Sequence, residues 1–358
     1  RVSRGLGDVY KRQRLCNLYY GNSSKKLVNK NKTIPLNGIK EISFDQIEII
    51  TRNSKKKIFV NQIKYLPKLI KRKINFDLKK IKSKKKNFSN LDFRKIPNIM
   101  GVLNLTPDSF SDGGKFNSKK KGINHAISLF NCGANLIDIG GESTRPGSKV
   151  IKENLEWQRI EKILKSLIKK KIPISLDTRK SRIMIKGIDL GVKLINDVSG
   201  LEFDSQTLSI LKKFKVPFVI QHSQGTPENM QKNPRYKNEL LDIYDFFEKK
   251  IKLLRSKGIK HNKIILDPGI GFGKNLKHNM SLIRNISIFH SLGFPILVGN
   301  SRKRFIKELS GKNDSKFRNG GTIASSIYLM MQGVQILRIH DVNETIQGLK
   351  IFKNIINN

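Results

Sequence analysis

Short apolar runs alternate with helix-length segments from residue 96 to the end of the chain. Each run is rich in Ile, Val or Leu, which is typical of a strand buried on both faces of a parallel sheet. The runs cover residues 96–105, 134–139, 172–176, 193–195, 217–220, 263–266, 294–298 and 335–339. The segments between and after them cover residues 119–131, 153–170, 179–190, 238–257, 276–291, 321–332 and 342–354. This alternation predicts right-handed βαβ units.

Eight such repeats in about 265 residues match the usual size of a (β/α)₈ TIM barrel. An open doubly wound sheet alternates in the same way, but nearly every run here ends in polar residues. These are Asn104, Asp138, Asp177, Asn196, Asp197, His222, Asp267, Ser301, Arg338 and His340. The strand ends of a closed barrel converge on one mouth, whereas an open sheet spreads them along an edge. We therefore predict an α/β fold with one site at the mouth of a TIM barrel.

The residues before 93 follow a different pattern and predict a small N-terminal extension. Residues 1–13 have no initiator Met and no apolar core, and we set them aside as an artefactual leader. Alternation predicts a strand at 39–49, while residues 58–69 fit a strand or a short helix broken by Pro67. Residues 79–86 predict a basic linker. The predicted organisation is a leader at 1–13, an extension of unknown role at 14–92, and a barrel at 93–358.

The formal net charge is +43, with 71 Lys and Arg against 28 Asp and Glu. Such an excess is found in proteins that bind nucleic acids or anionic membranes. Here it consists mainly of Lys scattered along the chain, which favours solvated helix faces over a specific nucleic-acid surface. Cys16 and Cys132 are too few and too far apart for a disulfide framework and fit a reducing compartment. No apolar run approaches the roughly 20 residues of a membrane helix, so we expect a cytoplasmic protein without a membrane partner.

Asp177, Asn196 and Asp267 form the first candidate constellation. Carboxylates at the rim of an apolar barrel are costly unless they receive charge-assisted hydrogen bonds, so a ligand with several N–H donors is implied. The aminopyrimidinone ring of a pterin or guanine offers such an edge. Each residue alone could instead cap the following helix. Three of them at corresponding strand ends favour a binding site.

A cationic constellation follows the last two strands. Ser301 and Lys303 come after the seventh strand, and Arg338 and His340 alternate along the eighth, so the latter two point the same way. Loops after these strands are the common phosphate site of TIM barrels, and a phosphate or diphosphate is the natural ligand. For Lys303, a solvated surface position is an equally simple interpretation in a Lys-rich chain.

Three loops are rich in turn-forming residues. Residues 106–114 and 138–147 fit lids over the barrel mouth, although inert surface loops have the same composition. Residues 267–274 carry three spaced glycines, but their spacing matches neither a P-loop nor the dinucleotide-binding fingerprint. We interpret this third segment as a loop beside Asp267 that presents Phe272 to the mouth.

Together these motifs resemble the dihydropteroate synthases, which are the folate-pathway members of the pterin-binding barrels. The resemblance covers residues from about 96 to 345 and rests on eight motifs in order. They are Asn104-Leu-Thr-Pro-Asp-Ser-Phe-Ser-Asp112, Asp138-Ile-Gly-Gly-Glu-Ser-Thr-Arg-Pro146, Asp177-Thr178, Asn196-Asp197, Gln224-Gly-Thr-Pro227, Asp267-Pro-Gly-Ile-Gly-Phe-Gly273, Ser301-Arg-Lys303 and Arg338-Ile-His-Asp341.

The resemblance implies condensation of (7,8-dihydropterin-6-yl)methyl diphosphate with 4-aminobenzoate, which gives 7,8-dihydropteroate and diphosphate. It also implies a role for each matching residue. The pterin is expected at Asp177, Asn196, Asp267, Lys303 and Arg338, and the diphosphate at Thr144, Arg338 and His340. The 4-aminobenzoate subsite, where sulfonamides compete, is expected at Arg145, Pro146, Phe272, Ser301 and Arg304. Asp138 is expected to order a loop, Asn104 to help place Mg²⁺, and the protein to form a homodimer.

Two positions depart from the common pattern of the family. Ser223 stands where many members have Met, and Arg304 stands where many have Ser. These positions leave substrate affinity and sulfonamide sensitivity open. Two alternatives to the synthase also stay open: a pterin-binding methyltransferase that serves a corrinoid protein, and a basic nucleic-acid-binding protein. The methyltransferase would not need the loop around Arg145 or the pair formed by Arg338 and His340.

Overall fold

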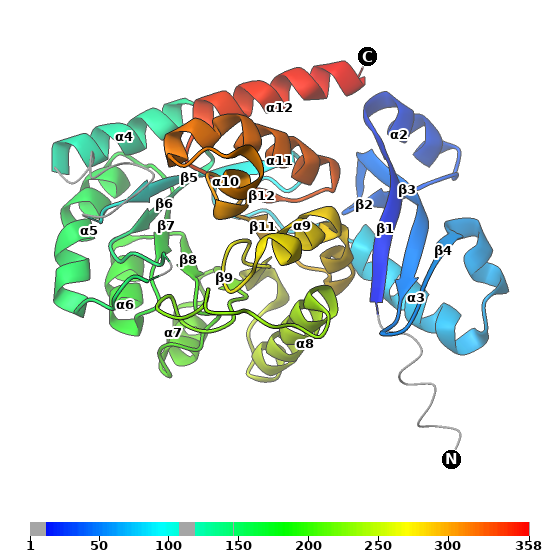
Figure 1. Ribbon diagram of the computed structural model, residues 1–358, viewed down its shortest axis with the longest axis horizontal. Coiled ribbons are helices and arrows are strands. Elements are labelled where there is room, and N and C mark those ends of the chain that lie inside the picture. Colours follow the sequence, from blue (N-terminus) through cyan, green and yellow to red (C-terminus); the bar gives the residue numbers. More distant parts are fainter. Residues whose placement is uncertain (1–11, 107–118, 146, 358) are drawn as a thin grey trace.

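The apolar runs form the strands of one eight-stranded parallel sheet in the computed structural model, which describes residues 12–106, 119–145 and 147–357 (Figure 1). The strands are β5 (Asn98–Asn104), β6 (Leu136–Gly140), β7 (Ile174–Asp177), β8 (Leu194–Asp197), β9 (Phe218–Gln221), β10 (Ile264–Asp267), β11 (Leu297–Val298) and β12 (Ile336–Ile339). Their order is β10-β9-β8-β7-β6-β5-β12-β11. An isolated bridge between Leu266 and Ile296 brings the two ends together. The TIM-like barrel is therefore nearly closed, as predicted.

Helices cover the outside of this barrel. They are α4 (Lys119–Asn131), α5 (Glu153–Lys169), α6 (Ser181–Leu190), α7 (Thr207–Phe214), α8 (Glu239–Ser256), α9 (Leu276–Arg284), α10 (Arg304–Ser310), α11 (Asn319–Met331) and α12 (Val342–Asn357). The short helices α7 and α10 were not predicted. The single helix expected at 276–291 is wrong, because the segment divides at Asn285 into α9 and a 3₁₀ segment, η3 (Ile286–Leu292).

The barrel interior consists of two layers of different chemistry. Inward-facing residues of the lower layer are apolar and pack with Leu91 and Phe93, which precede the first barrel strand. They include Met100, Leu136, Leu194, Val219, Ile265, Leu297 and Ile336. Side chains of a strand return to the same face after two residues. Two residues further along β6, β8, β10 and β12 stand Asp138, Asn196, Asp267 and Arg338. The polar side chains at the strand ends therefore lie directly above the apolar lower layer.

The N-terminal extension is a separate antiparallel sheet with two helices. Its strands are β1 (Arg12–Tyr20), β2 (Ile34–Leu36), β3 (Ile39–Ile50) and β4 (Lys55–Phe59), and β3 pairs with the other three. Helix α2 spans Gly21–Asn29, the 3₁₀ segment η1 spans Val60–Tyr65, and α3 spans Lys68–Lys82. The strand predicted at 39–49 is confirmed as β3. The linker expected at 79–86 is wrong in its first half, because residues 79–82 belong to α3.

This sheet, which we call the N-terminal module (residues 12–82), packs against one side of the barrel (Figure 1). Strand β1 and helix α3 cover η3, and the Ser287 hydroxyl donates to the Leu15 carbonyl at 3.1 Å. The Tyr20 hydroxyl donates to the Met331 carbonyl at 2.7 Å. Arg12, which we expected in the leader, starts β1 and pairs with Glu248 at 2.8 Å. Residues 1–11 of that leader lie outside the described residues.

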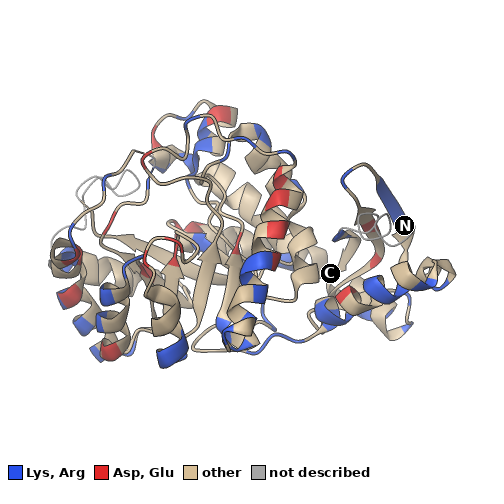
Figure 2. Cartoon of the chain, turned by 90° about the horizontal axis from the view of Figure 1, so that it is seen from below, with Lys and Arg blue, Asp and Glu red and all other residues tan. Residues whose placement is uncertain are grey.

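Lys and Arg are distributed over the helices of both the barrel and the module (Figure 2). This distribution agrees with the interpretation of the charge as solvated helix faces. Among the described residues, we found no helix with the length and apolar character needed to cross a membrane.

Candidate active site

Four strand ends meet around one guanidinium group at the mouth of the barrel. Arg338 on β12 donates through Nε to Asp138 Oδ2 at 2.6 Å and through Nη2 to Asp177 Oδ2 at 2.8 Å. Asn196 donates through Nδ2 to the same Asp138 oxygen at 3.0 Å. The fork of Arg338 on β12 thus binds the ends of two neighbouring strands, β6 and β7, as the polar ends of a closed barrel predict.

These groups leave several buried acceptors without a partner among the described residues. They are Asp138 Oδ1, Asp177 Oδ1 and Asn196 Oδ1. Burial raises the pKa of Asp177 to about 8, and the nearby Arg338 opposes that rise. Buried polar atoms are normally hydrogen-bonded, and leaving one unpaired costs on the order of 1–3 kcal/mol. The arrangement therefore suits a ligand that brings N–H donors.

The third predicted acceptor, Asp267, lies at the end of β10. Its Oδ1 accepts from the Gly269 amide at 2.8 Å, and burial raises its pKa to about 6. Lys303 contributes a positive field at Asp267, and desolvation in the mouth lowers the pKa of Lys303 to about 8. The ammonium of Lys303 lies 4.3 Å from the ring centre of Phe272, which is a cation–π contact.

The cationic constellation is assembled on the other side of the mouth. Ser301 Oγ lies 3.1 Å from His340 Nδ1 and accepts from the His340 amide at 3.2 Å. Burial and the neighbouring cations Arg302 and Arg338 lower the pKa of His340 well below its usual value. The imidazole is therefore neutral near pH 7, and can donate one hydrogen bond to an anion without adding charge.

A cavity of about 290 Å³ opens above these groups. Most predicted site residues line it: Asn104, Thr144, Arg145, Phe272, Ser301, Lys303, Arg304, Arg338 and His340. Asp138, Asp177, Asn196 and Asp267 do not line the cavity, because they are buried in the upper interior layer. Pro146 and residues 107–114 of the first predicted lid lie outside the described residues.

The sequence did not single out three residues that shape this site. Met230 and Gln231, from the segment between β9 and α8, line the cavity, and Gln231 donates to the Gly271 carbonyl at 2.7 Å. Lys274 is buried, and its ammonium donates to the Phe272 carbonyl at 2.8 Å. Its position directly after the glycine-rich loop was the only available signal, and in a Lys-rich chain that signal is weak.

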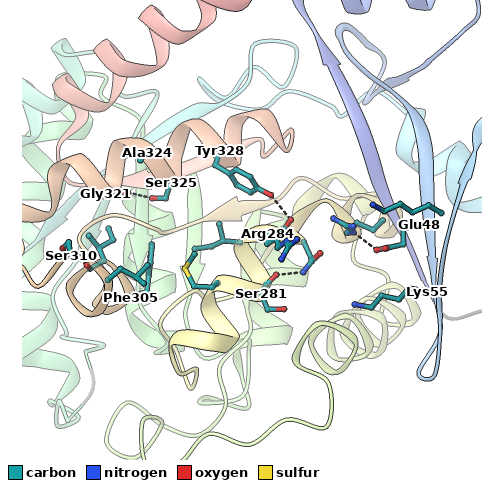
Figure 3. A pocket seen from close by; sticks show the side chains of 17 residues that line it. Glu48, Lys55, Ser281, Arg284, Phe305, Ser310, Gly321, Ala324, Ser325 and Tyr328 are labelled. Carbon is teal, nitrogen blue, oxygen red and sulfur yellow. Dashed lines mark hydrogen bonds and ion pairs between the residues drawn. The ribbon is translucent and has the colours of Figure 1, made fainter.

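A second and larger cavity, of about 1110 Å³, lies between the N-terminal module and helices α9, α10 and α11 (Figure 3). On the module side it is bordered by Lys55 and by Glu48, which accepts from Arg14 at 2.9 Å. On the barrel side it is bordered by Phe305 and Tyr328. None of the predicted site residues lines it. The larger of these two cavities is therefore not the candidate active site.

Comparison with known proteins identifies the family. Residues 100–340 match the model of a protein family described as pterin binding enzyme. The dihydropteroate synthase of Escherichia coli K12 is 38% identical over 256 residues, which span 71% of this chain and 90% of that protein. The chain belongs to the dihydropteroate synthases. Its activity is accordingly that of a transferase in folate biosynthesis.

Solved structures agree with this assignment. The Yersinia pestis dihydropteroate synthase with a sulfonamide drug is 39% identical, with a TM-score of 0.72 over 75% of this chain and 97% of the other. The Xanthomonas albilineans enzyme with 4-aminobenzoic acid is 34% identical, with a TM-score of 0.67 over 72% and 93%. These relatives are synthases, which favours this reaction over the methyltransferase alternative. Most of the N-terminal module lies outside the matched length.

Proposed function

We propose that the barrel mouth condenses (7,8-dihydropterin-6-yl)methyl diphosphate with 4-aminobenzoate to give 7,8-dihydropteroate and diphosphate. The observation that supports this most directly is a set of buried acceptors on Asp138, Asp177 and Asn196 that have no partner within the described part of the chain, next to a cavity bordered by cations. A pterin edge supplies N–H donors for the acceptors, and a diphosphate supplies negative charge for the cations.

In this proposal the pterin enters above the upper interior layer. Asp177, Asn196 and Asp267 accept its N–H groups, and Lys303 and Arg338 lie beside the ring. Asp138 keeps Arg338 and Asn196 in place, because one of its oxygens accepts from both. Its expected role in ordering a loop stays a prediction. The carboxylates favour the electron-poor pterin as positive charge develops on its methylene carbon.

The diphosphate lies toward Thr144, Arg338 and His340, which line the cavity. The fixed cation and the neutral imidazole stabilise the charge of the leaving group. Asn104 offers a half-buried amide oxygen beside them. Mg²⁺ commonly binds through one or two protein oxygens together with water and substrate phosphates, so this donor fits the ion. When bound, Mg²⁺ would add positive charge at the diphosphate.

The 4-aminobenzoate lies between the loop that carries Thr144 and the turn at Ser301, bordered by Arg145, Pro146, Phe272 and Arg304. The C–O bond to diphosphate breaks first and leaves a pterin-methyl cation. The neutral aromatic amine attacks this cation, and the resulting secondary ammonium loses one proton to solvent or to the departing diphosphate. The amine needs no strong base, because its nitrogen is already nucleophilic. Positioning and charge stabilisation therefore supply the rate acceleration.

Ser223 and Arg304 differ from the common family pattern and bear on the affinity for the substrates and for sulfonamides. Ser223, whose hydroxyl lies 3.4 Å from the Gly225 carbonyl, offers a smaller contact surface than a Met would. Arg304 is largely exposed and donates to Glu308 at 2.6 Å. Both residues leave sulfonamide sensitivity as a question for measurement. We also propose a cytoplasmic homodimer without a specific nucleic-acid partner.

The decisive experiment measures diphosphate release from the purified chain with Mg²⁺ and the dihydropterin diphosphate, with and without 4-aminobenzoate. We expect release that depends on 4-aminobenzoate, with dihydropteroate formed in equal amount. The matched variant is Asp177→Ala, which should nearly abolish turnover while the protein stays folded. A variant with native rates would remove Asp177 from the mechanism.

Absence of release despite tight pterin binding would point to the methyltransferase alternative or to a barrel that only binds. The nucleic-acid alternative predicts an affinity that falls steeply with salt. Negligible binding of duplex DNA and of RNA near physiological salt would exclude it.

A further inference from the structure

A buried cluster of charges lies beside the mouth and has no part in the mechanism described above. Glu142, Glu156, Arg179 and Lys180 are each less than a tenth exposed. Lys180 donates to Glu156 at 2.6 Å and also pairs with Glu142. Arg179 donates to Glu142 at 2.7 Å, and Thr178 donates to Glu156 at 2.6 Å. Two carboxylates thus face two cations, and the cluster is neutral overall.

Glu142 lies at the neck of the loop between β6 and α5, which is the point where the two ends of the loop meet. The loop leaves the barrel at Glu142 and returns at Ile151, whose amide donates back to Glu142 Oε2 at 3.1 Å. Ser148 closes the loop from inside, because its single hydroxyl proton is shared between the carbonyls of Ser143 and Arg145, each 2.7 Å from Oγ. The described part of this loop, residues 143–145 and 147–150, carries Thr144 and Arg145, which border the cavity.

The cations that hold this neck come from the strand that carries a proposed pterin ligand. Arg179 and Lys180 follow Asp177 at the end of β7, and Glu156 lies in the first turn of α5. Lys180 therefore connects the start of the loop, the helix that follows it, and the strand end beneath the pterin. These contacts therefore link Thr144 and Arg145, on the loop, to Asp177 on β7.

We propose that Glu142, Lys180 and Glu156 form a clamp that positions Thr144 and Arg145 for attack by the amine and departure of the diphosphate. All three are positioning residues: Lys180 and Glu156 act through Thr144 and Arg145, and Glu142, which also lines the cavity, holds the start of the loop. This inference deepens the proposed function and rests on it for the identity of the substrates. Replacing a buried ion pair with apolar groups is often neutral for stability, so stability alone does not explain the cluster.

The test compares Lys180→Met with the double variant Lys180→Met/Glu156→Gln. The single variant leaves Glu156, whose pKa burial already raises, without its cation, and is expected to be less stable. The double variant removes that uncompensated charge and should recover stability. It should not recover function, because α5 is no longer tied to Glu142.

For both variants we expect kcat/KM for 4-aminobenzoate to fall on the order of 100-fold, the effect of misplacing reacting groups by about 1 Å. The Kd of a pterin, measured by calorimetry, should not change. Lys180→Arg should recover part of the activity. Lys165→Met is the matched control, since it breaks an exposed pair with Glu161, and it should behave as wild type.

A second readout does not depend on activity. The bond after Lys149 lies in the exposed part of the loop and is a trypsin site. Tryptic cleavage there should be faster in the double variant than in wild type at equal global stability, and unchanged in Lys165→Met. If activity returned together with stability in the double variant, or if cleavage at Lys149 were unaffected, the clamp would be only structural. If wild type formed no dihydropteroate but Lys149 still became accessible, the proposed function would fail and the clamp would stand.

Discussion

The two interior layers of the barrel follow the same strands, only two residues apart, and behave in opposite ways. In the lower layer, Leu136 and Ile265 are packed with other branched side chains and are almost fully buried. In the upper layer, Asp138 and Asp267 are equally buried but carry charge. The lower layer is complete without a ligand. The upper layer still contains acceptors without partners among the described residues, so a ligand completes it.

The contrast shows how one strand can serve stability and chemistry at once. The apolar layer gives the barrel a closed floor and fixes the register of the strands. It also excludes water from below, so the charges above interact through a medium of low dielectric constant. The same burial that strengthens the Arg338 pairs raises the pKa of Asp177 and Asp267.

Arg338→Met should break the upper layer and have the largest effect. It leaves Asp138 and Asp177 buried without their cation and removes the proposed contact to the diphosphate. We expect turnover to fall on the order of 1000-fold in steady-state assays. Arg338→Lys keeps the charge without the fork and should be intermediate. A Met variant with a native rate would show that the guanidinium serves structure alone.

Leu136→Ala should break the lower layer while leaving the upper layer chemically intact. Removing a fully buried Leu costs about 3 kcal/mol of unfolding free energy, because the cavity relaxes only partly. Urea denaturation measures this loss. Below the unfolding transition, the Kd of a pterin should stay close to the wild-type value. A large loss of pterin affinity without a loss of stability would mean that the two layers are not separable.

The pH dependence of pterin binding should test the upper layer alone, with a smaller effect than either substitution above. Asp267 must be ionised to accept an N–H group, and its pKa in the free protein is about 6. Asp177, whose pKa burial raises to about 8, is already largely protonated at that pH. As the pH falls further the Asp267 carboxyl is protonated as well, so below about pH 6 the Kd should rise by up to about tenfold per pH unit. Titration calorimetry between about pH 5 and 8 measures the slope. Asp267→Asn should bind more weakly and lose this dependence, and an unchanged slope would assign the proton to another group.

Arg304→Ser should have the smallest effect of the four. The residue is exposed, and its pair with Glu308 is worth about 0.3–0.5 kcal/mol. Stability and the Kd of a pterin should therefore stay close to wild type. The KM for 4-aminobenzoate should change by less than about tenfold. A larger change would place Arg304 in direct contact with the amine substrate.

The sequence predicted the barrel because polar residues at strand ends are a local pattern. The local sequence pattern did not predict elements whose formation depends on contacts with distant parts of the chain. Helices α7 and α10 are too short for a clear periodicity. Strand β1 begins with two buried polar residues: Arg12, which pairs with the barrel, and Gln13, which donates to the Ile74 carbonyl within the module. Nothing in their local sequence shows that the distant Glu248 pairs with Arg12.

Some residues of the candidate site likewise have a local sequence signal, and others are recognised only from the fold. Asp177, Arg338 and His340 could be predicted, because charges inside apolar strands are unusual. Lys180 and Lys274 could not, since burial distinguishes them from the other lysines and burial is a property of the fold. The contacts of Lys180 with Glu142 and Glu156 join residues 38 and 24 positions apart, which a single sequence does not connect.

The bond between Ser287 and the Leu15 carbonyl spans 272 positions of the chain, and it bears on the order of events during synthesis. At about 5–20 residues per second, a ribosome needs roughly 15–50 s to make the segment between them. The side of β1 that later covers η3 is exposed to solvent throughout that time. The bridge between Leu266 and Ile296, which closes the barrel, also forms late. The module, residues 12–82, is therefore synthesised early, but its packing against η3 and the closure of the barrel both come late in translation.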